Sequence, residues 1–194
     1  MSPPPLSRVT LVLLANVVLY ALCYMMQTPV LPYLVEELGA TDTAYGYLMS
    51  AMAVVQFVGG LLAGPILDVY GARVVLLASY GSSAACYALT GAARGMPLLY
   101  ASRVPTLLQH AVMATRAAVA EASSEADRAR LLGYIGVAYG IGMVLGPALG
   151  GVLSARDLRL TAWVAAAGSL LSVGARPRVA PARQRPCRVC MAAP

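Results

Sequence analysis

Residues 133–151 read GYIGVAYGIGMVLGPALGG, and this stretch decides the fold. Glycine in a helix interior costs about 1 kcal/mol relative to alanine, and proline costs about 3 kcal/mol. An apolar helix with so many of both therefore needs a packing reason for them. Gly142, Gly146 and Gly150 recur every four residues and form a ridge without side chains, so a neighbouring helix can approach closely. Pro147 can kink the helix, and the carbonyls that it frees must then be satisfied inside the protein.

The chain around this stretch is too apolar for a soluble domain. Its 194 residues are 59% hydrophobic and 11% charged, and the mean hydropathy is +0.72. A soluble domain carries about 25% charged residues. We therefore predict an integral membrane protein whose first partner is the lipid bilayer. The net charge of +6 does not indicate nucleic acid, because most arginines flank predicted membrane segments or lie in residues 176–194.

The apolar segments predict how often the chain crosses the membrane. A crossing helix needs about 20 mostly apolar residues, and six segments satisfy or approach this length. They are Val9–Pro29, Ala44–Leu67, Val74–Ala93, Pro97–Ala118, Leu131–Leu153 and Leu160–Gly174. The prediction is an all-α, polytopic bundle of about six transmembrane helices over residues 1–175. Residues 176–194 are rich in arginine and proline and predict a disordered cytoplasmic tail.

The arginines predict the orientation, because basic residues in short loops stay on the cytoplasmic side. With the amino terminus inside, most loop arginines are cytoplasmic. They are Arg8, Arg73, Arg116, Arg128, Arg130 and those of the tail, against Arg94, Arg156 and Arg159 in outer loops. The first outer loop holds Glu36, Glu37 and Asp42 with no basic residue. We therefore predict a multi-pass protein of the plasma membrane or an intracellular membrane, with both termini cytoplasmic.

The glycine-proline pattern of the fifth segment resembles a known motif. It is similar to the antiporter signature on the fifth helix of drug/proton antiporters in the major facilitator superfamily. The matching positions are Gly133, Gly142, Gly146, Pro147, Gly150 and Gly151. An ordinary packing face of small residues is the alternative, and it explains only part of the string. The resemblance implies the amino-terminal six-helix half of a major facilitator fold.

The turn between the second and third segments resembles the loop signature of the same superfamily. The matching positions are Gly64, Asp68, Gly71 and Arg73. Val69 and Ala72 replace usual basic residues, which implies a weaker version of the conformational latch that this loop forms in the family. A short turn needs a flexible residue at Gly71, and Asp68 is expected to accept backbone N–H bonds and to pair with Arg73. A simple helix-turn-helix is the alternative explanation.

The fourth segment carries two ionisable residues. Arg103 lies at a depth where a charge is costly unless it faces a polar cavity or a partner. The superfamily often has an arginine here that is implicated in proton coupling, whereas snorkelling to the outer interface is the alternative. His110 follows seven residues later, hence on the same helical face, and could relay protons or simply pack. Val104-Pro105-Thr106 replaces the glycine-containing stretch that usually follows the arginine.

A polar stripe on the first segment predicts the wall of a cavity. The stripe comprises Asn16, Tyr20, Cys23 and Gln27. These residues fall within about 60° of one helical face at about 100° per residue. Polar groups in lipid are costly, so we expect this face to line an interior cavity, with Gln56 and Gln109 as further hydrogen-bond donors. Hydrogen bonding between helices is an equally good explanation.

Residues 121–130 read EASSEADRAR and resemble the acidic-then-arginine loop before the fifth helix in this superfamily. We expect this loop to cap helices. The sequence has no phosphate loop, no metal cluster and no supported Ser/His/Asp set, so we predict neither an enzyme nor a cofactor or metal site. Cys187-x-x-Cys190 lacks the second ligand pair of a metal site.

The resemblance implies a proton-coupled carrier that exports small organic, often cationic, solutes by alternating access. The stretches at 30–34, 45–48 and 101–105 are similar to the organic cation transporter-like, solute carrier family 22 member 18, type. Two six-helix halves rock around a midplane site in this architecture, so we expect the chain alone not to transport. A truncated product that needs a carboxyl-terminal half is the first expectation. A homodimer, or a regulatory membrane protein that pairs with a full-length relative, are the alternatives.

Overall fold

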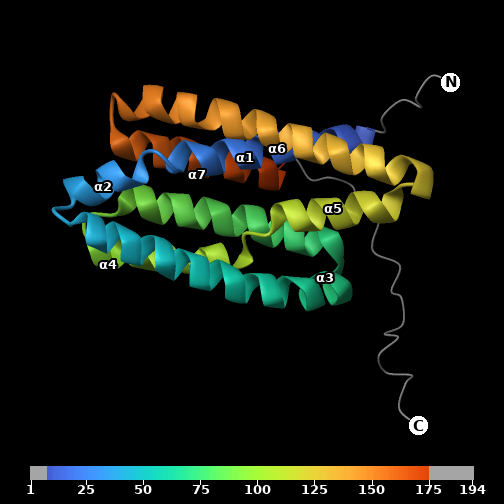
Figure 1. Cartoon of the computed structure of the whole chain (residues 1–194), viewed down its shortest axis with the longest axis horizontal. Helices are drawn as coiled ribbons and strands as arrows, with labels where there is room; N and C mark the ends of the chain where they lie inside the picture. Colours follow the sequence, from blue (N-terminus) through green and yellow to red (C-terminus); the bar gives the residue numbers. More distant parts are fainter. Residues whose placement is uncertain (1–7, 175–194) are drawn as a thin grey trace, which may run out of the picture.

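The computed structural model describes residues 8–174, and these residues form an all-α bundle. The helices lie along the long axis of the bundle (Figure 1). In chain order they are α1 (Arg8–Gln27), α2 (Leu31–Glu37), α3 (Asp42–Ala92), α4 (Met96–Ala101), the 3₁₀ helix η1 (Val104–Leu108), α5 (Ala111–Ala122), α6 (Glu125–Ser154) and α7 (Leu158–Gly174). The predicted tail at 176–194, with Cys187 and Cys190, lies outside the described residues.

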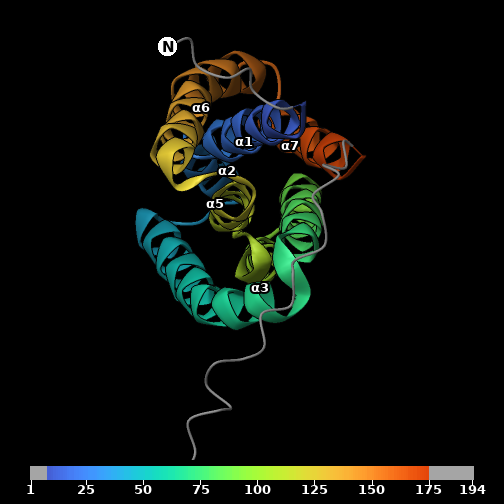
Figure 2. The same ribbon diagram turned by 90° about the vertical axis from the view of Figure 1, so that its right-hand side faces the viewer.

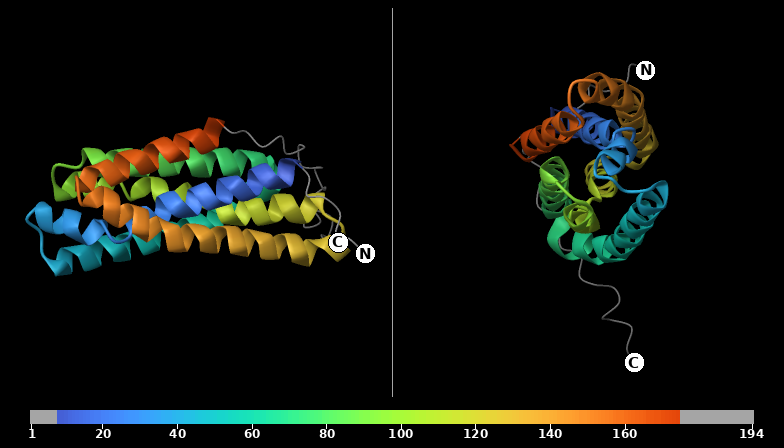
Figure 3. Two further views of the ribbon diagram at one scale, coloured as in Figure 1. Left: turned by 90° about the horizontal axis from the view of Figure 1, so that it is seen from above. Right: turned by 90° about the vertical axis from the view of Figure 1, so that its left-hand side faces the viewer.

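The first helix lies among the others rather than on the surface (Figure 2). Its most extensive contact is with α6, and it also packs against α7 and α5. The opposite side of the bundle is built around α3, and α7 lies beside the returning limb of α3 (Figure 3). Because neighbours cover α1 on several sides, its polar residues can avoid lipid.

The outer surface of the bundle is apolar. Phe57 on α3 is 68% exposed, and Val144 on α6 is 74% exposed. Contiguous exposed apolar surface of this kind fits a bilayer rather than water. Three helical stretches are long and apolar enough to span a membrane, namely Thr10–Glu37, Asp42–Ala92 and Glu125–Ser154. Leu158–Gly174 is apolar but shorter.

The predicted second and third segments are the two limbs of α3, so the two helices are present as predicted, and they are joined at Gly71 without an intervening loop. Two limbs of α3 run in opposite directions (Figure 1) and meet at Gly71, whose φ of 78° and ψ of 165° interrupt the helical backbone. A positive φ is costly for residues with a side chain but not for glycine. One glycine therefore reverses the chain without a loop, and the prediction of a flexible residue at Gly71 is confirmed.

The expected ion pair of this turn was wrong. Asp68 and Arg73 are both exposed. Within residues 8–174 the ion pairs are Arg130–Asp127 and Arg159–Glu37, so Asp68 and Arg73 do not pair. Water competes well for two exposed charges, because such a pair contributes about 0–1 kcal/mol.

The predicted fourth segment is also not one helix. It is divided into α4, η1 and α5. Pro97 and Pro105 occupy the first turns of α4 and η1, where a missing N–H costs little. Gln109 and His110 then leave helical geometry, with φ and ψ of −79° and 61° and of −116° and 34°. The prediction of one continuous helix over Pro97–Ala118 was therefore wrong.

The glycine ridge of α6 packs directly on α1, as predicted. A Cβ atom on Gly142 would lie 2.5 Å from Ala21 Cβ, and one on Gly146 would lie 2.5 Å from Met25 Cβ. The same atom on Gly150 would lie 2.5 Å from the carbonyl oxygen of Met26. The remaining motif positions, Gly133 and Gly151, face open space. α6 continues as one helix through Pro147.

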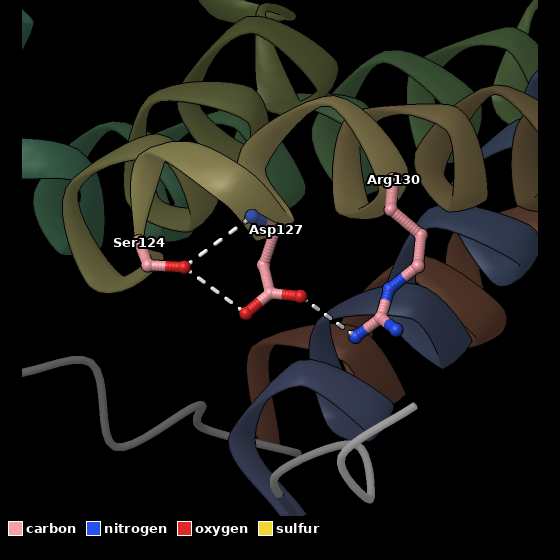
Figure 4. A network of polar contacts seen from close by, with 3 residues as sticks. All are labelled: Ser124, Asp127 and Arg130. Atoms are coloured by element: carbon pink, nitrogen blue, oxygen red, sulfur yellow. Dashed lines mark hydrogen bonds and ion pairs between the residues drawn. The ribbon is translucent and has the colours of Figure 1, made fainter. Parts of the chain in front are cut away.

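Polar contacts order the two ends of the bundle. At the start of α6, the Ser124 hydroxyl oxygen accepts the Asp127 backbone N–H at 3.3 Å, and the Asp127 carboxylate pairs with Arg130 at 3.1 Å (Figure 4). The prediction that this loop caps a helix is confirmed. At the opposite end, Arg159 pairs with Glu37 at 3.1 Å and joins α7 to α2. α2 itself is a short helix that the sequence reading treated as loop.

Candidate functional site

A cavity of about 320 Å³ lies beside the break in the fourth segment. Its size falls within the range of about 300–1,000 Å³ that is usual for small-molecule sites. It is lined by α1, the first limb of α3, the break itself, α5 and α6. The lining residues are Tyr20, Tyr24, Gln56, Gln109, His110, Val112, Met113, Arg116 and Tyr139.

Side chains from other helices hold the break open. The Ser79 hydroxyl donates to the Leu108 carbonyl at 2.7 Å and accepts the His110 backbone N–H at 3.2 Å. The Tyr20 hydroxyl donates to the Gln109 carbonyl at 3.1 Å. Non-helical backbone at membrane depth is tolerated only where such partners satisfy it. The break is therefore a stabilised feature of the site rather than a local defect.

Gly59 on the first limb of α3 makes room for the break. A Cβ atom at this position would collide with the carbonyl oxygen of Leu107 and lie 2.8 Å from His110 Nε2. Glycine therefore lets the backbone of η1 approach α3 directly. His110 also borders a second, apolar cavity of about 30 Å³ between η1 and the limbs of α3.

Two buried polar atoms at the cavity have no hydrogen-bond partner within the described part of the chain. They are Nε2 of Gln109, a side chain only 7% exposed, and Nε2 of His110. Buried polar atoms are nearly always hydrogen-bonded, so each exception needs an explanation. Both residues line the same cavity, and a small shift of their side chains would bring the two covered nitrogens to a bound solute or water.

The sequence-predicted polar residues fall into two groups. Tyr20, Gln56, Gln109 and His110 line the cavity together. The remaining stripe residues are buried elsewhere along α1. The Asn16 amide donates to the Val12 carbonyl at 3.0 Å. Cys23 faces α7, where a Cβ atom on Gly168 would lie 2.6 Å from its sulfur, and Gln27 is 8% exposed. Because α1 has neighbours on several sides, the polar residues of its stripe face different neighbours rather than one cavity.

Arg103 is buried away from the cavity lining. Its side chain is 6% exposed, and Nε donates to the Ser102 hydroxyl at 3.1 Å. Its other nitrogens donate to the Thr90 hydroxyl and contact the Met52 sulfur. No carboxylate pairs with it among residues 8–174. The guanidinium therefore does not snorkel outward, and it depends on neutral groups of α3.

The shared helical face predicted for Arg103 and His110 was wrong, because η1 and the break lie between them. Sequence reasoning also missed Tyr24, Tyr139 and Arg116 as cavity residues. Tyr24 lies one turn beyond Tyr20, which was a usable signal. Arg116 was counted only among the arginines at the cytoplasmic side, and it lies within α5. Nothing in the sequence alone distinguishes Tyr139 from the other tyrosines of the chain.

Comparison with known proteins identifies the family. Residues 13–186 match the Major Facilitator Superfamily. The chain belongs to this superfamily. It is therefore an integral, multi-pass membrane protein of a transporter family rather than an enzyme family.

Curated relatives support the assignment. The chain is 37% identical over 155 residues to human solute carrier family 67 member A1, covering 77% of this chain and 37% of that protein. It is 36% identical over 137 residues to mouse solute carrier family 22 member 18, covering 68% and 34% respectively. The class G tetracycline resistance protein of Vibrio anguillarum is 40% identical over 129 residues, covering 64% and 33%. The chain thus spans little more than a third of the length of these relatives.

A solved structure has the same fold. The crystal structure of the human organic anion transporter MFSD10 (TETRAN) matches with a TM-score of 0.75 and 28% sequence identity. The match covers 90% of this chain and 48% of that chain. The bundle described above therefore corresponds to about half of a solved superfamily member.

Proposed function

We propose that this chain is one half of a proton-coupled antiporter for small organic solutes and works with an opposing half. The observation that carries the proposal is the cavity with two buried, unpartnered nitrogens, on Gln109 and His110. Solute sites in transporters are typically formed where an interrupted helix lines a cavity near the midplane. The superfamily membership supports the same conclusion.

The proposal assigns this chain to the amino-terminal half and gives it six crossings. The crossings are α1, the two limbs of α3, the broken segment from Met96 to Ala122, α6 and α7. Both ends of the described chain then lie on one side, together with Arg73, Arg128 and Arg130. We assign this side to the cytoplasm, because the opposite end carries the acidic residues of α2 and fewer arginines.

The motif residues receive roles in this proposal. Arg103 and His110 take part in proton coupling. The loop of Gly64, Asp68, Gly71 and Arg73 contacts the opposing half in one conformation. In the antiporter motif (Gly133, Gly142, Gly146, Pro147, Gly150 and Gly151), the buried glycines keep α1 and α6 together while the halves rock. The similarity to solute carrier family 22 member 18 supports a place in that branch of the superfamily.

The printed names of the relatives suggest solutes of either charge. The predicted organic cation transporter-like type favours cations, the human crystal structure is titled an organic anion transporter, and several relatives are tetracycline resistance proteins. Tetracycline is therefore a suitable first test solute.

Flux measurements test the proposal. We expect the purified chain in proteoliposomes to show no tetracycline uptake driven by a proton gradient. The carboxyl-terminal half of solute carrier family 67 member A1, reconstituted with it, should restore uptake, and Arg103→Ala should abolish that uptake without preventing insertion. Absence of flux with every opposing half, from a folded and inserted chain, would overturn the transporter proposal.

The alternatives give different results. Gradient-driven flux by the chain alone, from a species with the mass of a dimer, indicates a homodimeric transporter. Co-purification with a full-length relative that alters the flux of that relative, with none from the chain itself, indicates a regulatory membrane protein.

A further inference from the structure

We propose that the cavity binds an aromatic anion rather than an organic cation. The negative group of the solute pairs with Arg116, an acceptor oxygen of the solute takes the N–H of Gln109, and its ring lies against the tyrosines. This inference rests on the proposed function and names the substrate class of its site.

The described residues supply no counter-ion for a cation at the cavity, so an opposing half would have to provide one. Arg116 is the lining residue with a permanent charge, and the cavity has no carboxylate in its lining. The chain has eight acidic residues, and all of them fall within the described part. None is buried, and they are Glu36, Glu37, Asp42, Asp68, Glu121, Glu125, Asp127 and Asp157. A desolvated cation in this cavity would face Arg116 without compensation, which is costly.

A second positive charge, unlike the exposed Arg116, is buried. Arg103 is 6% exposed and has no ion-pair partner among the described residues. Interactions between charges are much less screened inside a protein than in water, so this guanidinium adds to the positive potential of the interior. The interior of the described chain therefore holds the charge of Arg103 and no acidic charge, which favours an anion.

The cavity also offers an unpartnered hydrogen-bond donor, which an anion can satisfy. Gln109 is more than nine-tenths buried, and its Nε2, a donor, has no partner among the described residues. The Tyr20 hydroxyl donates to the backbone carbonyl of the same residue at 3.1 Å, so the backbone that carries the amide is held in place. A carboxylate, phenolate or carbonyl oxygen can accept its N–H, whereas an ammonium cannot.

The rings that line the cavity favour an aromatic solute. Tyr20 and Tyr24 come from α1, and Tyr139 comes from α6. The Tyr20 ring also contacts Tyr80, with centroids 6.2 Å apart and planes tilted by 58°, so its orientation is fixed. Aromatic pairs contribute beyond simple burial when they are stacked with an offset or edge to face. A planar solute can use these faces while its charged group reaches Arg116.

A matched series of naphthalenes tests the inference. The full chain in phosphatidylcholine nanodiscs is titrated calorimetrically with 2-naphthoate, 2-naphthalenemethanol and 2-naphthylmethylammonium, and empty nanodiscs give the blank. We expect 2-naphthoate to bind at least about tenfold more tightly than the ammonium, since a hydrogen bond to a charged group is worth a tenfold change or more. The neutral alcohol should lie between them.

Two variants locate the anion. Arg116→Gln should weaken the binding of 2-naphthoate by about tenfold and leave the binding of the alcohol nearly unchanged. Gln109→Leu should weaken the binding of both solutes. Arg128→Gln, which removes an exposed arginine away from the cavity, is the control and should change neither. Circular dichroism checks that each variant is folded.

Three results would overturn the inference. They are equal or tighter binding of the ammonium, equal losses for Arg116→Gln and Arg128→Gln, and no binding of any naphthalene. Each would leave the transporter proposal standing, because that proposal depends on proton-driven tetracycline flux with an opposing half.

Discussion

The α6 helix and the segment from Met96 to Ala122 respond to helix breakers in opposite ways. α6 contains seven glycines and Pro147 and is nevertheless one continuous helix. The segment from 96 to 122 contains no glycine, yet it is broken after Pro105. The number of helix-breaking residues therefore does not decide whether a membrane helix continues.

The difference lies in which backbone conformation the neighbouring helices stabilise. The buried glycines of α6 bring its backbone against α1, so packing with the helix intact compensates for their low propensity. At the break, Ser79 and Tyr20 hydrogen-bond the carbonyls that leave the helix. A continuous helix is stabilised in one region and an interrupted one in the other, and both depend on residues far away in the sequence.

The largest effect is expected at the contact between α6 and α1. Gly142→Ala places a methyl group 2.5 Å from Ala21 Cβ and 2.8 Å from the backbone nitrogen of Leu22, so two long helices must separate. We expect a loss of about 3 kcal/mol in stability. Thermal unfolding followed by circular dichroism in micelles measures it.

The matched control is Gly136→Ala on the same helix, where the added methyl group meets open space. It should raise stability by up to about 1 kcal/mol through helix propensity alone. Equal effects of both substitutions would show that the ridge does not hold α6 to α1.

A somewhat smaller effect is expected at the break. Gly59→Ala collides with the Leu107 carbonyl oxygen, and η1 must move away from α3. We expect a loss of about 2 kcal/mol and a changed reactivity of His110 toward diethyl pyrocarbonate. Gly46→Ala, on the same limb but in open space, is the control, and similar behaviour of the two variants would contradict the close approach of η1.

Removing the hydrogen bonds of the break should have a moderate effect. Ser79→Ala leaves the Leu108 carbonyl and the His110 N–H without their partner, at a cost of about 1–2 kcal/mol. Ser83→Ala is the control, because its hydroxyl only returns to the Ser79 carbonyl of its own helix. Unfolding midpoints that fall equally for both variants would mean that Ser79 does not stabilise the break.

The smallest effect is expected at the start of α6. Asp127→Ala removes the contact with the Ser124 hydroxyl and the ion pair with Arg130, both partly exposed. We expect a loss of about 0.5–1 kcal/mol, which should diminish in high salt. Glu125→Gln, in the same turn, serves as the control, and an unchanged loss in high salt would argue against the ion pair.

Local patterns allowed part of this fold to be predicted. The spacing of Gly142, Gly146 and Gly150 indicates a packing ridge, because helical periodicity is a property of a short segment. Gly71 was predicted as a flexible turn because a short turn between two apolar segments can also be recognised from neighbouring residues alone. The break at Gln109 was not predicted, because its stability comes from Tyr20 and Ser79, which are distant in sequence.

The candidate site was predicted only in part, for a related physical reason. Residue type identified Tyr20, Gln56, Gln109 and His110, because polar groups in an apolar segment are unusual. The face that each residue presents depends on how neighbours surround α1 and α5. The sequence therefore could not show that Tyr20 lines the cavity while Cys23 and Gln27 do not. It also could not show that Arg116 is part of the cavity.

The glycine ridge also has a consequence for synthesis at the ribosome. It joins Ala21 and Leu22, near the start of the chain, to Gly142. At roughly 5–20 residues per second, the first helix leaves the ribosome many seconds before its main partner exists. During this interval the polar side chains of α1 must be accommodated by the insertion machinery or by temporary neighbours. The most extensive contact of the bundle is thus one of the last to form, and membrane insertion must precede much of the packing.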